Sequence, residues 1–176
     1  RFMTDTRRAL HMIPEQSFRE ADTRRYLLSL FSDAECEKRE LSCGSVALFF
    51  DVGKENTAAF RCELDALPVN ELNESAYKSN RKGFMHACGH DAHMSMGLAV
   101  AHWVMDNKDK LSGKIKILFQ PAEEGVRGDA GMAASGILDD CDYFLGSHVA
   151  MSAKSGELAT NLYGYLCTTK FDVTFH

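Results

Sequence analysis

Hydrophobic and polar positions along the chain predict an alternation of strands and helices. Five segments rich in β-branched and aromatic residues are typical of strands, and they cover residues 45–51, 58–64, 114–119, 143–148 and 166–175. Between the second and third, apolar residues recur at three- and four-residue steps. This spacing predicts a helix with Asp91 as its N-cap that ends near Asn107.

Shorter helices are expected over residues 4–11, 18–31 and 130–138. Strands that alternate with helices at this spacing favour an α/β fold, a three-layer sandwich with a mixed, largely parallel sheet. Ligands in such folds gather beyond the carboxyl ends of the strands. The polar clusters of the sequence fall at those ends.

Composition excludes several classes of function. The chain has 176 residues, 45% of them hydrophobic, and a net charge of -5, which together predict one ordinary globular domain without a phosphate-binding surface. Nucleic acid is therefore not an expected partner. The longest apolar stretch, residues 97–105, is interrupted by His102 and falls short of the ~20 residues of a membrane span. We expect a cytoplasmic protein with no membrane association.

Six cysteines are present without a CxxC pair, in a chain large enough to fold without disulfides. Five are expected to be reduced and structural. Cys88 is the exception, because it alone lies among histidines. Residues 86–93 contain three histidines, a thiol and a carboxylate, and thiolate and imidazole are preferred zinc ligands.

Within this segment, Cys88 and His90 can face one site if the chain turns between them, which Gly89 permits. For His86 and His93 the sequence leaves three roles open: packing, hydrogen bonding to a metal ligand, and coordination of the metal itself.

Three further strand ends carry polar residues. Glu123 and Glu124 follow the strand at 114–119, and neighbouring carboxylates point in different directions, so that one can bind metal while the other handles protons. A solvated acidic turn is the alternative, which the buried strand before it disfavours. His148 ends the strand at 143–148 and alone would be interpreted as a core histidine.

The strand at 58–64 leads into Glu63 and Asp65, two acids that share one face. An apolar strand rarely carries such a pair without a function.

Taken together, the segments Arg8–His11, ELDALP at 63–68, MHACGHDAH at 85–93, FQPAEEG at 119–125 and Gly146–His148 resemble one known family. It is the amidohydrolase branch of the zinc aminoacylase and carboxypeptidase family, which includes hippurate hydrolase, indole-acetyl-amino-acid hydrolases and aminobenzoyl-glutamate hydrolases. Segments 140–146 and 164–175 look most similar to the aminobenzoyl-glutamate hydrolase A-subunit type.

The resemblance implies a zinc-peptidase-like catalytic domain with two divalent metal ions, zinc or manganese. The ligands it implies are Cys88, which would bridge the ions, His90, Glu124 and His148. Glu123 would be the general base, and Asp65 would orient a ligand or tune the base. Glu63 stands where many peptidases of the family have a histidine ligand, and its contact with metal stays open.

The resemblance also implies a longer protein. Residues 1–167 would be the N-terminal part of the catalytic domain, and residues 168–176 would begin a strand that leads into a lid domain absent from this chain. The last histidine ligand would be absent too, and His176 would not replace it. The parent protein would be a homodimer, or a heteromer with a related protein, through that lid.

The implied reaction is metal-dependent hydrolysis of the amide bond of small N-acyl or N-aroyl amino acids, such as aminobenzoyl-glutamate or hippurate-like compounds. Two alternatives remain. A non-catalytic metal-binding or metal-sensing module would use the same ligands, although a closed structural zinc site needs no spare base such as Glu123. In a cysteine hydrolase, Cys88 would instead be a nucleophile with a histidine partner.

Overall fold

The structure is a computed structural model that describes residues 1–53, 55–125, 127–149, 154–160 and 173–174. Its centre is a five-stranded sheet of β1 (Glu37–Glu40), β2 (Val46–Asp51), β3 (Thr57–Glu63), β4 (Lys114–Gln120) and β5 (Tyr143–Gly146). The strand order is β1-β2-β4-β3-β5. The pairings of β3 with β4 and with β5 are parallel, whereas β1 with β2 and β2 with β4 are antiparallel. The predicted mixed sheet is confirmed.

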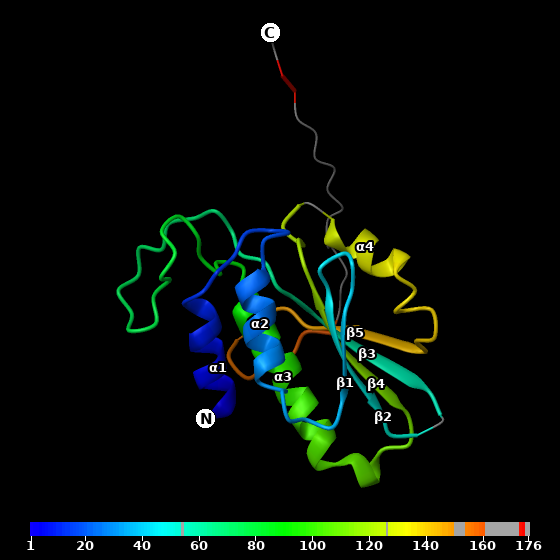
Figure 1. Cartoon of the computed structure of the whole chain (residues 1–176). Coiled ribbons are helices and arrows are strands. Elements are labelled where there is room, and N and C mark those ends of the chain that lie inside the picture. The colour runs from blue at the N-terminus through cyan, green and yellow to red at the C-terminus, as the bar shows by residue number, and fades with distance from the viewer. Residues whose placement is uncertain (54, 126, 150–153, 161–172, 175–176) are drawn as a thin grey trace.

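Helices cover both faces of this sheet. On one face lie α1 (Phe2–His11), α2 (Ala21–Ser29) and α3 (His90–Asp106), and on the other lies α4 (Gly128–Ala134), as Figure 1 shows. A short 3-10 turn, Lys108–Lys110, follows α3. The three-layer α/β sandwich is confirmed. No helix in the described part of the chain is long and apolar enough to cross a membrane.

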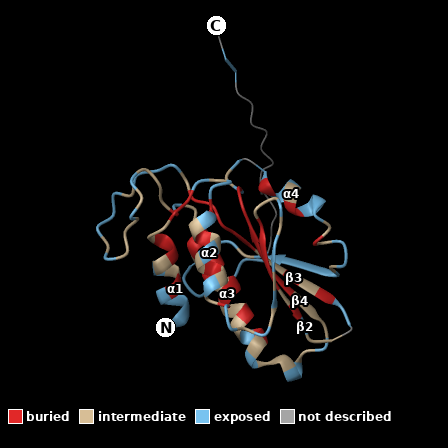
Figure 2. Cartoon of the chain, viewed as in Figure 1, coloured by how far each residue is buried: buried red, intermediate tan, exposed pale blue. Residues whose placement is uncertain are grey.

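Two hydrophobic clusters hold the layers together, because successive side chains of a strand point to opposite faces. Leu48, Ile117 and Phe119 pack towards α1, α2 and α3 in the larger cluster. Ala47 and Leu118, one residue away, pack towards α4 in the smaller one. The buried residues in Figure 2 accordingly concentrate on the sheet and on the helix faces turned towards it.

Some elements differ from the sequence prediction. Strand β1 was not predicted, because its four residues are all charged and none is buried. Helix α4 begins and ends earlier than expected. Helix α2 spans Ala21–Ser29 and not the predicted residues 18–31, and Phe18, at the start of the predicted range, has a positive φ of 60° that a helix does not allow. The strand expected at 166–175 lies outside the described residues apart from 173–174, which are not in a strand.

Helix α3 begins two residues earlier than predicted, which affects the site, and the prediction of Asp91 as its N-cap is wrong. Gly89 is the N-cap residue, with φ 94°, and Asp91 lies inside the first turn. The Asp91 carboxylate does not cap the helix, because it accepts from His11 Nδ1 at 2.7 Å and from Arg7 Nε at 2.7 Å. This buried ion pair fastens α1 to the start of α3.

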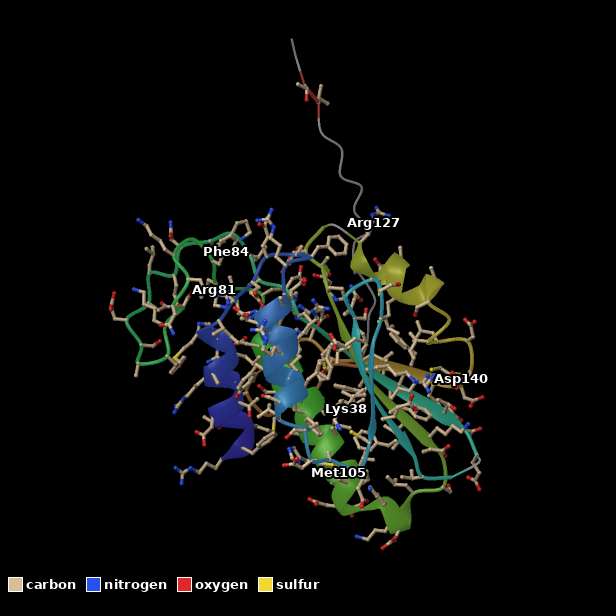
Figure 3. All side chains as sticks on the ribbon, viewed as in Figure 1. Lys38, Arg81, Phe84, Met105, Arg127 and Asp140 are labelled. Atoms are coloured by element: carbon tan, nitrogen blue, oxygen red, sulfur yellow. The ribbon has the colours of Figure 1, made fainter. Side chains whose placement is uncertain are left out.

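The mutually parallel strands β3, β4 and β5 end at one edge of the sheet, and α3 begins at that same edge. The loop between β3 and α3 extends from this end of the molecule (Figure 1). Arg81 anchors the loop to the region of α2 through ion pairs with Glu15, at 3.0 Å, and Asp22 (Figure 3).

Candidate active site

The left-handed conformation of Gly89 turns Cys88 and His90 towards a common point. The side chain of Val149 occupies the place that a Cβ at position 89 would take, so only glycine fits this turn. Cys88 Sγ lies 3.4 Å from Nε2 of His148, which follows β5. Residues 60 positions apart in the sequence therefore meet here.

His90 is fully buried, and the segment that follows β3 fixes its orientation. Its Nδ1 donates a hydrogen bond to the backbone carbonyl of Asp65 at 2.7 Å. Its Nε2 is buried without a partner and lies 3.8 Å from Glu124 Oε1, which is also buried without a partner. Oε2 of Glu123 lies 3.8 Å from the same nitrogen. Unsatisfied buried groups cost free energy, so these two atoms mark a place for a ligand.

Asp65 connects the carboxyl ends of β3 and β4. Its Oδ2 accepts hydrogen bonds from Ser17 Oγ at 2.7 Å and from the backbone N–H of Glu124 at 2.9 Å. Burial raises the pKa of Asp65, but the hydrogen bonds from His90, Glu124 and Ser17 outweigh it and lower the pKa to about 2. An ionised Asp65 thus orients both His90 and the segment that carries Glu124.

The protonation of Cys88 argues against a cysteine nucleophile. Burial and the nearby carboxylate of Glu124 raise the pKa of the Cys88 thiol to about 12. Nucleophilic cysteines need a lowered pKa. A thiol in this environment ionises only when a cation is bound to it.

The donor set fits divalent metal. Two groups of potential ligand atoms, each within 4.8 Å of one another, share His90: Cys88, His90 and His148 form one, and His90, Glu123 and Glu124 form the other. Thiolate, imidazole and carboxylate are ligands of zinc and similar ions. The structure therefore brings together Cys88, His90, Glu124 and His148, the residues expected as ligands, with Glu123 beside them.

Glu123 stands at the open side of this group, with its side chain 41% exposed. Burial and the charge of Glu124 raise the pKa of the Glu123 carboxyl. A raised pKa brings a carboxylate closer to the range in which it takes and returns protons near neutral pH.

Glu63 and His93 form a buried support beneath the site. Glu63 Oε1 is bonded to Arg61, and its Oε2 accepts from His93 Nδ1 at 2.8 Å. His93 Nε2 in turn accepts from the backbone N–H of Val149 at 2.9 Å. Glu63, His90 and His93 are also close enough to hold an ion, but both oxygens of Glu63 and both nitrogens of His93 are already hydrogen-bonded. These residues hold the segment of His148 in place.

His86 lies on the other side of Cys88. It is 3% exposed, and burial lowers its pKa to about 4, so the ring is neutral. Its two nitrogens have no hydrogen-bond partner. Of the three histidines in segment 86–93, the structure thus places His90 among the candidate ligands, His93 in a supporting network, and His86 in the wall of a cavity of about 660 Å³.

Sequence reasoning missed several residues that shape the site. Ser17 bonds to Asp65, and Arg61, itself held by Gln120 at 2.7 Å and 2.9 Å, bonds to Glu63. Arg61 and Glu63 are two residues apart on one strand and therefore lie on the same face of it. This spacing was the signal in the sequence that could have indicated Arg61. For Ser17 no local signal exists, since its partner is 48 residues away.

Comparison with known proteins identifies the family. The sequence pattern of peptidase family M20/M25/M40 matches residues 59–175. The chain belongs to this family. It is 50% identical over 147 residues to a Haemophilus influenzae homologue of the A-subunit of p-aminobenzoyl-glutamate hydrolase, and the match covers 79% of this chain and 34% of that protein. The resemblance inferred from the motifs is confirmed.

Two further comparisons agree with the M20 assignment. Indole-3-acetyl-aspartic acid hydrolase of Enterobacter agglomerans is 41% identical over 71% of this chain and 30% of its own length. The crystal structure of a dinuclear metal binding peptidase of the M20 family from Bacillus subtilis superposes with a TM-score of 0.78 at 30% identity, covering 83% of this chain and 42% of that one. The chain spans about a third of the length of each of these two relatives.

Proposed function

We propose that the parent protein is a metal-dependent amidohydrolase that cleaves the amide bond of small N-acyl or N-aroyl amino acids. The observation that carries the proposal is the pair of buried, unpartnered atoms His90 Nε2 and Glu124 Oε1, 3.8 Å apart. Relatives named as hydrolases of p-aminobenzoyl-glutamate and indole-3-acetyl-aspartate support the substrate class.

Cys88, His90, Glu124 and His148 would hold two divalent ions, zinc or manganese. Bound ions of this kind polarise an amide carbonyl and lower the pKa of water towards ~7. The dinuclear relative from Bacillus subtilis supports two ions. The accumulation of negative charge from Glu63, Asp65, Glu123 and Glu124 around His90 favours a cation over an empty site.

Glu123 would act as the general base. It would take the proton of the attacking water and then return it to the leaving amine, so that a carboxylic acid and a free amino acid are released. Asp65 would keep His90 and the Glu124 segment in position during this exchange. A closed structural metal site would leave Glu123 without a role, which favours the enzyme over the metal-sensing module.

We further propose that residues 1–167 are the N-terminal part of the catalytic domain, and that residues 168–176 lead into a lid domain. A homodimer, or a heteromer with a related protein, would then form through the lid. The Haemophilus influenzae relative, whose name refers to one subunit of a hydrolase, supports an assembly. Free thiols at Cys36, Cys43, Cys62, Cys88 and Cys141 support the reducing cytoplasm as its compartment.

The test uses the full-length protein. Metal content per chain and release of amino acid from aminobenzoyl-glutamate and hippurate are measured for the wild type, Glu123→Gln, Cys88→Ser and the surface control Glu35→Gln. Glu123→Gln is expected to keep metal and lose at least about a hundredfold in kcat, whereas Cys88→Ser loses both metal and turnover. Normal turnover by Glu123→Gln would refute the role of Glu123 as general base. A wild-type protein with a single tightly bound ion and no turnover would favour the non-catalytic metal-binding module.

A further inference from the structure

One buried carboxylate oxygen binds two turns of the chain that have a strained backbone. Among the described residues, three other than glycine have a positive φ: Phe18 at 60°, Ala122 at 54° and Arg127 at 59°. Residues with a side chain disfavour this left-handed conformation, because the Cβ comes too close to the following carbonyl oxygen. Glu20 Oε1 accepts hydrogen bonds from the backbone N–H of Phe18 at 3.0 Å and from that of Ala122 at 2.9 Å. Glu20 therefore holds two of these three residues.

Capping of α2 does not explain why Glu20 is buried. Glu20 is the N-cap residue of α2, but its side chain makes no capping hydrogen bond. The N–H of Thr23 in the first turn is instead bonded to Glu15 Oε2 at 2.7 Å. In the described part of the chain no cationic side chain pairs with the Glu20 carboxylate, which is 3% exposed and whose pKa is raised by burial. Burial of such a group costs free energy, so the role of Glu20 lies in the two turns that it holds.

Ala122 directly precedes Glu123, the proposed general base. Its N–H is the first of three successive N–H groups that bond to buried carboxylates. Those of Glu123 and Glu124 both bond to Asp65. A left-handed residue in a turn directs successive N–H groups to one side of the chain. The conformation of Ala122 and the two carboxylates, Glu20 and Asp65, therefore stabilise one another.

The backbone conformation of Ala122 determines where the Glu123 side chain lies. Rotation about φ of Ala122 turns every atom of the loop that follows it, so the common negative φ would carry the Glu123 carboxylate away from its place 3.8 Å from His90 Nε2. Glu124 has two further restraints, because its N–H is bonded to Asp65 and its carboxylate is a candidate metal ligand. Loss of the bond from Ala122 to Glu20 should therefore displace Glu123 more than Glu124.

We propose that Glu20 is a positioning residue for the general base: its carboxylate holds Ala122 in the left-handed conformation and so fixes the direction in which the Glu123 side chain leaves the backbone. The inference rests on the proposed amidohydrolase function and adds to it a residue outside the ligand group. Because a small misplacement of a catalytic group costs a large part of the rate, loss of this hydrogen bond lowers kcat more than it weakens the binding of metal or substrate.

The test compares Glu20→Ala with Glu15→Ala in the full-length, metal-loaded enzyme, with aminobenzoyl-glutamate as substrate. Glu15 is the matched control, because it is a buried carboxylate of the same segment that bonds to α2 and to Arg81. Glu20→Ala is expected to lower kcat at least about tenfold, with KM within about threefold of the wild type and metal content unchanged. Glu15→Ala should lose stability with kcat unchanged. Amide hydrogen exchange of residues 122–124 should be at least about tenfold faster in Glu20→Ala alone.

Two conservative variants keep the test decisive if Glu20→Ala does not fold. Glu20→Gln loses the charge but keeps an acceptor oxygen at the same length, so kcat should stay within about threefold of the wild type. Glu20→Asp keeps the charge but withdraws the oxygen from the Ala122 N–H, so kcat should fall at least about tenfold.

The outcomes separate this role from the proposed reaction. A kcat of Glu20→Asp equal to that of the wild type, or an equal loss in Glu20→Gln and Glu20→Asp, would overturn the inference while the hydrolase stands. A wild type that cleaves no N-acyl amino acid would overturn the proposed function itself. The exchange rates of residues 122–124 would then still show whether Glu20 holds the turn.

Discussion

Replacing Gly97 by alanine should destabilise the protein, although alanine is the better helix former. Gly97 lies in α3 where the helix packs on the sheet, and a Cβ there would stand 2.6 Å from Cys62 Sγ and 3.3 Å from Ile117 Cγ2. Both neighbours are fully buried. Alanine gains ~1 kcal/mol of helix propensity, whereas overpacking a close-packed core costs ~1 to 3 kcal/mol. We expect a net loss of about 1 kcal/mol.

The Cys62→Ala background isolates the cause. Removing Sγ removes the closest contact, so Gly97→Ala should become neutral or stabilising there, with a coupling of ~1 to 3 kcal/mol between the two positions. Urea unfolding of wild type, both single variants and the double variant gives the four free energies of unfolding. If Gly97→Ala stabilises the wild type, or lowers the free energy of unfolding equally with and without the Cys62 side chain, the contact between position 97 and Cys62 Sγ does not limit how closely α3 approaches the sheet.

Three further predictions concern charges and supports. Lys116 is 3% exposed and donates to Ile137 O at 2.6 Å and to Asp140, which is labelled in Figure 3. Asp140→Asn removes the charge that pairs with Lys116 and should lower the free energy of unfolding by ~1 to 2 kcal/mol. A thermal melting curve that matches the wild type would contradict this. The hydrogen bond to Asp91 raises the pKa of His11 above 6.5, so its contribution to stability is complete below pH 6.5 and disappears as pH rises through the higher folded value. The difference between the urea midpoints of wild type and His11→Gln should therefore be largest below pH 6.5 and should shrink as the pH rises above it. A difference that stays constant with pH would exclude the effect. His93→Phe should weaken metal retention in dialysis ~10- to 100-fold without unfolding the protein, and full retention would show that His93 only packs.

Local signals were sufficient for much of the fold. The burial of β2 follows from its hydrophobic residues, whereas β4 also buries the polar residues Lys116 and Gln120, which hydropathy alone would leave exposed. The apolar spacing of α3 predicted that helix to within two residues of its observed ends. Strand β1 was beyond such reasoning, because its four charged residues give no hydrophobic pattern and it joins the sheet through backbone pairing with β2. The backbone hydrogen bonds of an edge strand carry no signature in side-chain hydropathy.

The sequence by itself determined which segments carry thiol, imidazole and carboxylate groups, and the resemblance to the family selected Cys88, His90, Glu124 and His148 among them as candidates for a metal centre. Their chemistry is local, since thiolate, imidazole and carboxylate are recognisable wherever they occur. Only the tertiary structure decided the different situations of His86, His90 and His93. Each depends on a partner, or on the lack of one, contributed by a distant segment: Asp65 for His90, Glu63 and Val149 for His93, and an open cavity for His86. Hydrogen bonds and burial arise between segments that meet only after folding, so no local pattern encodes them.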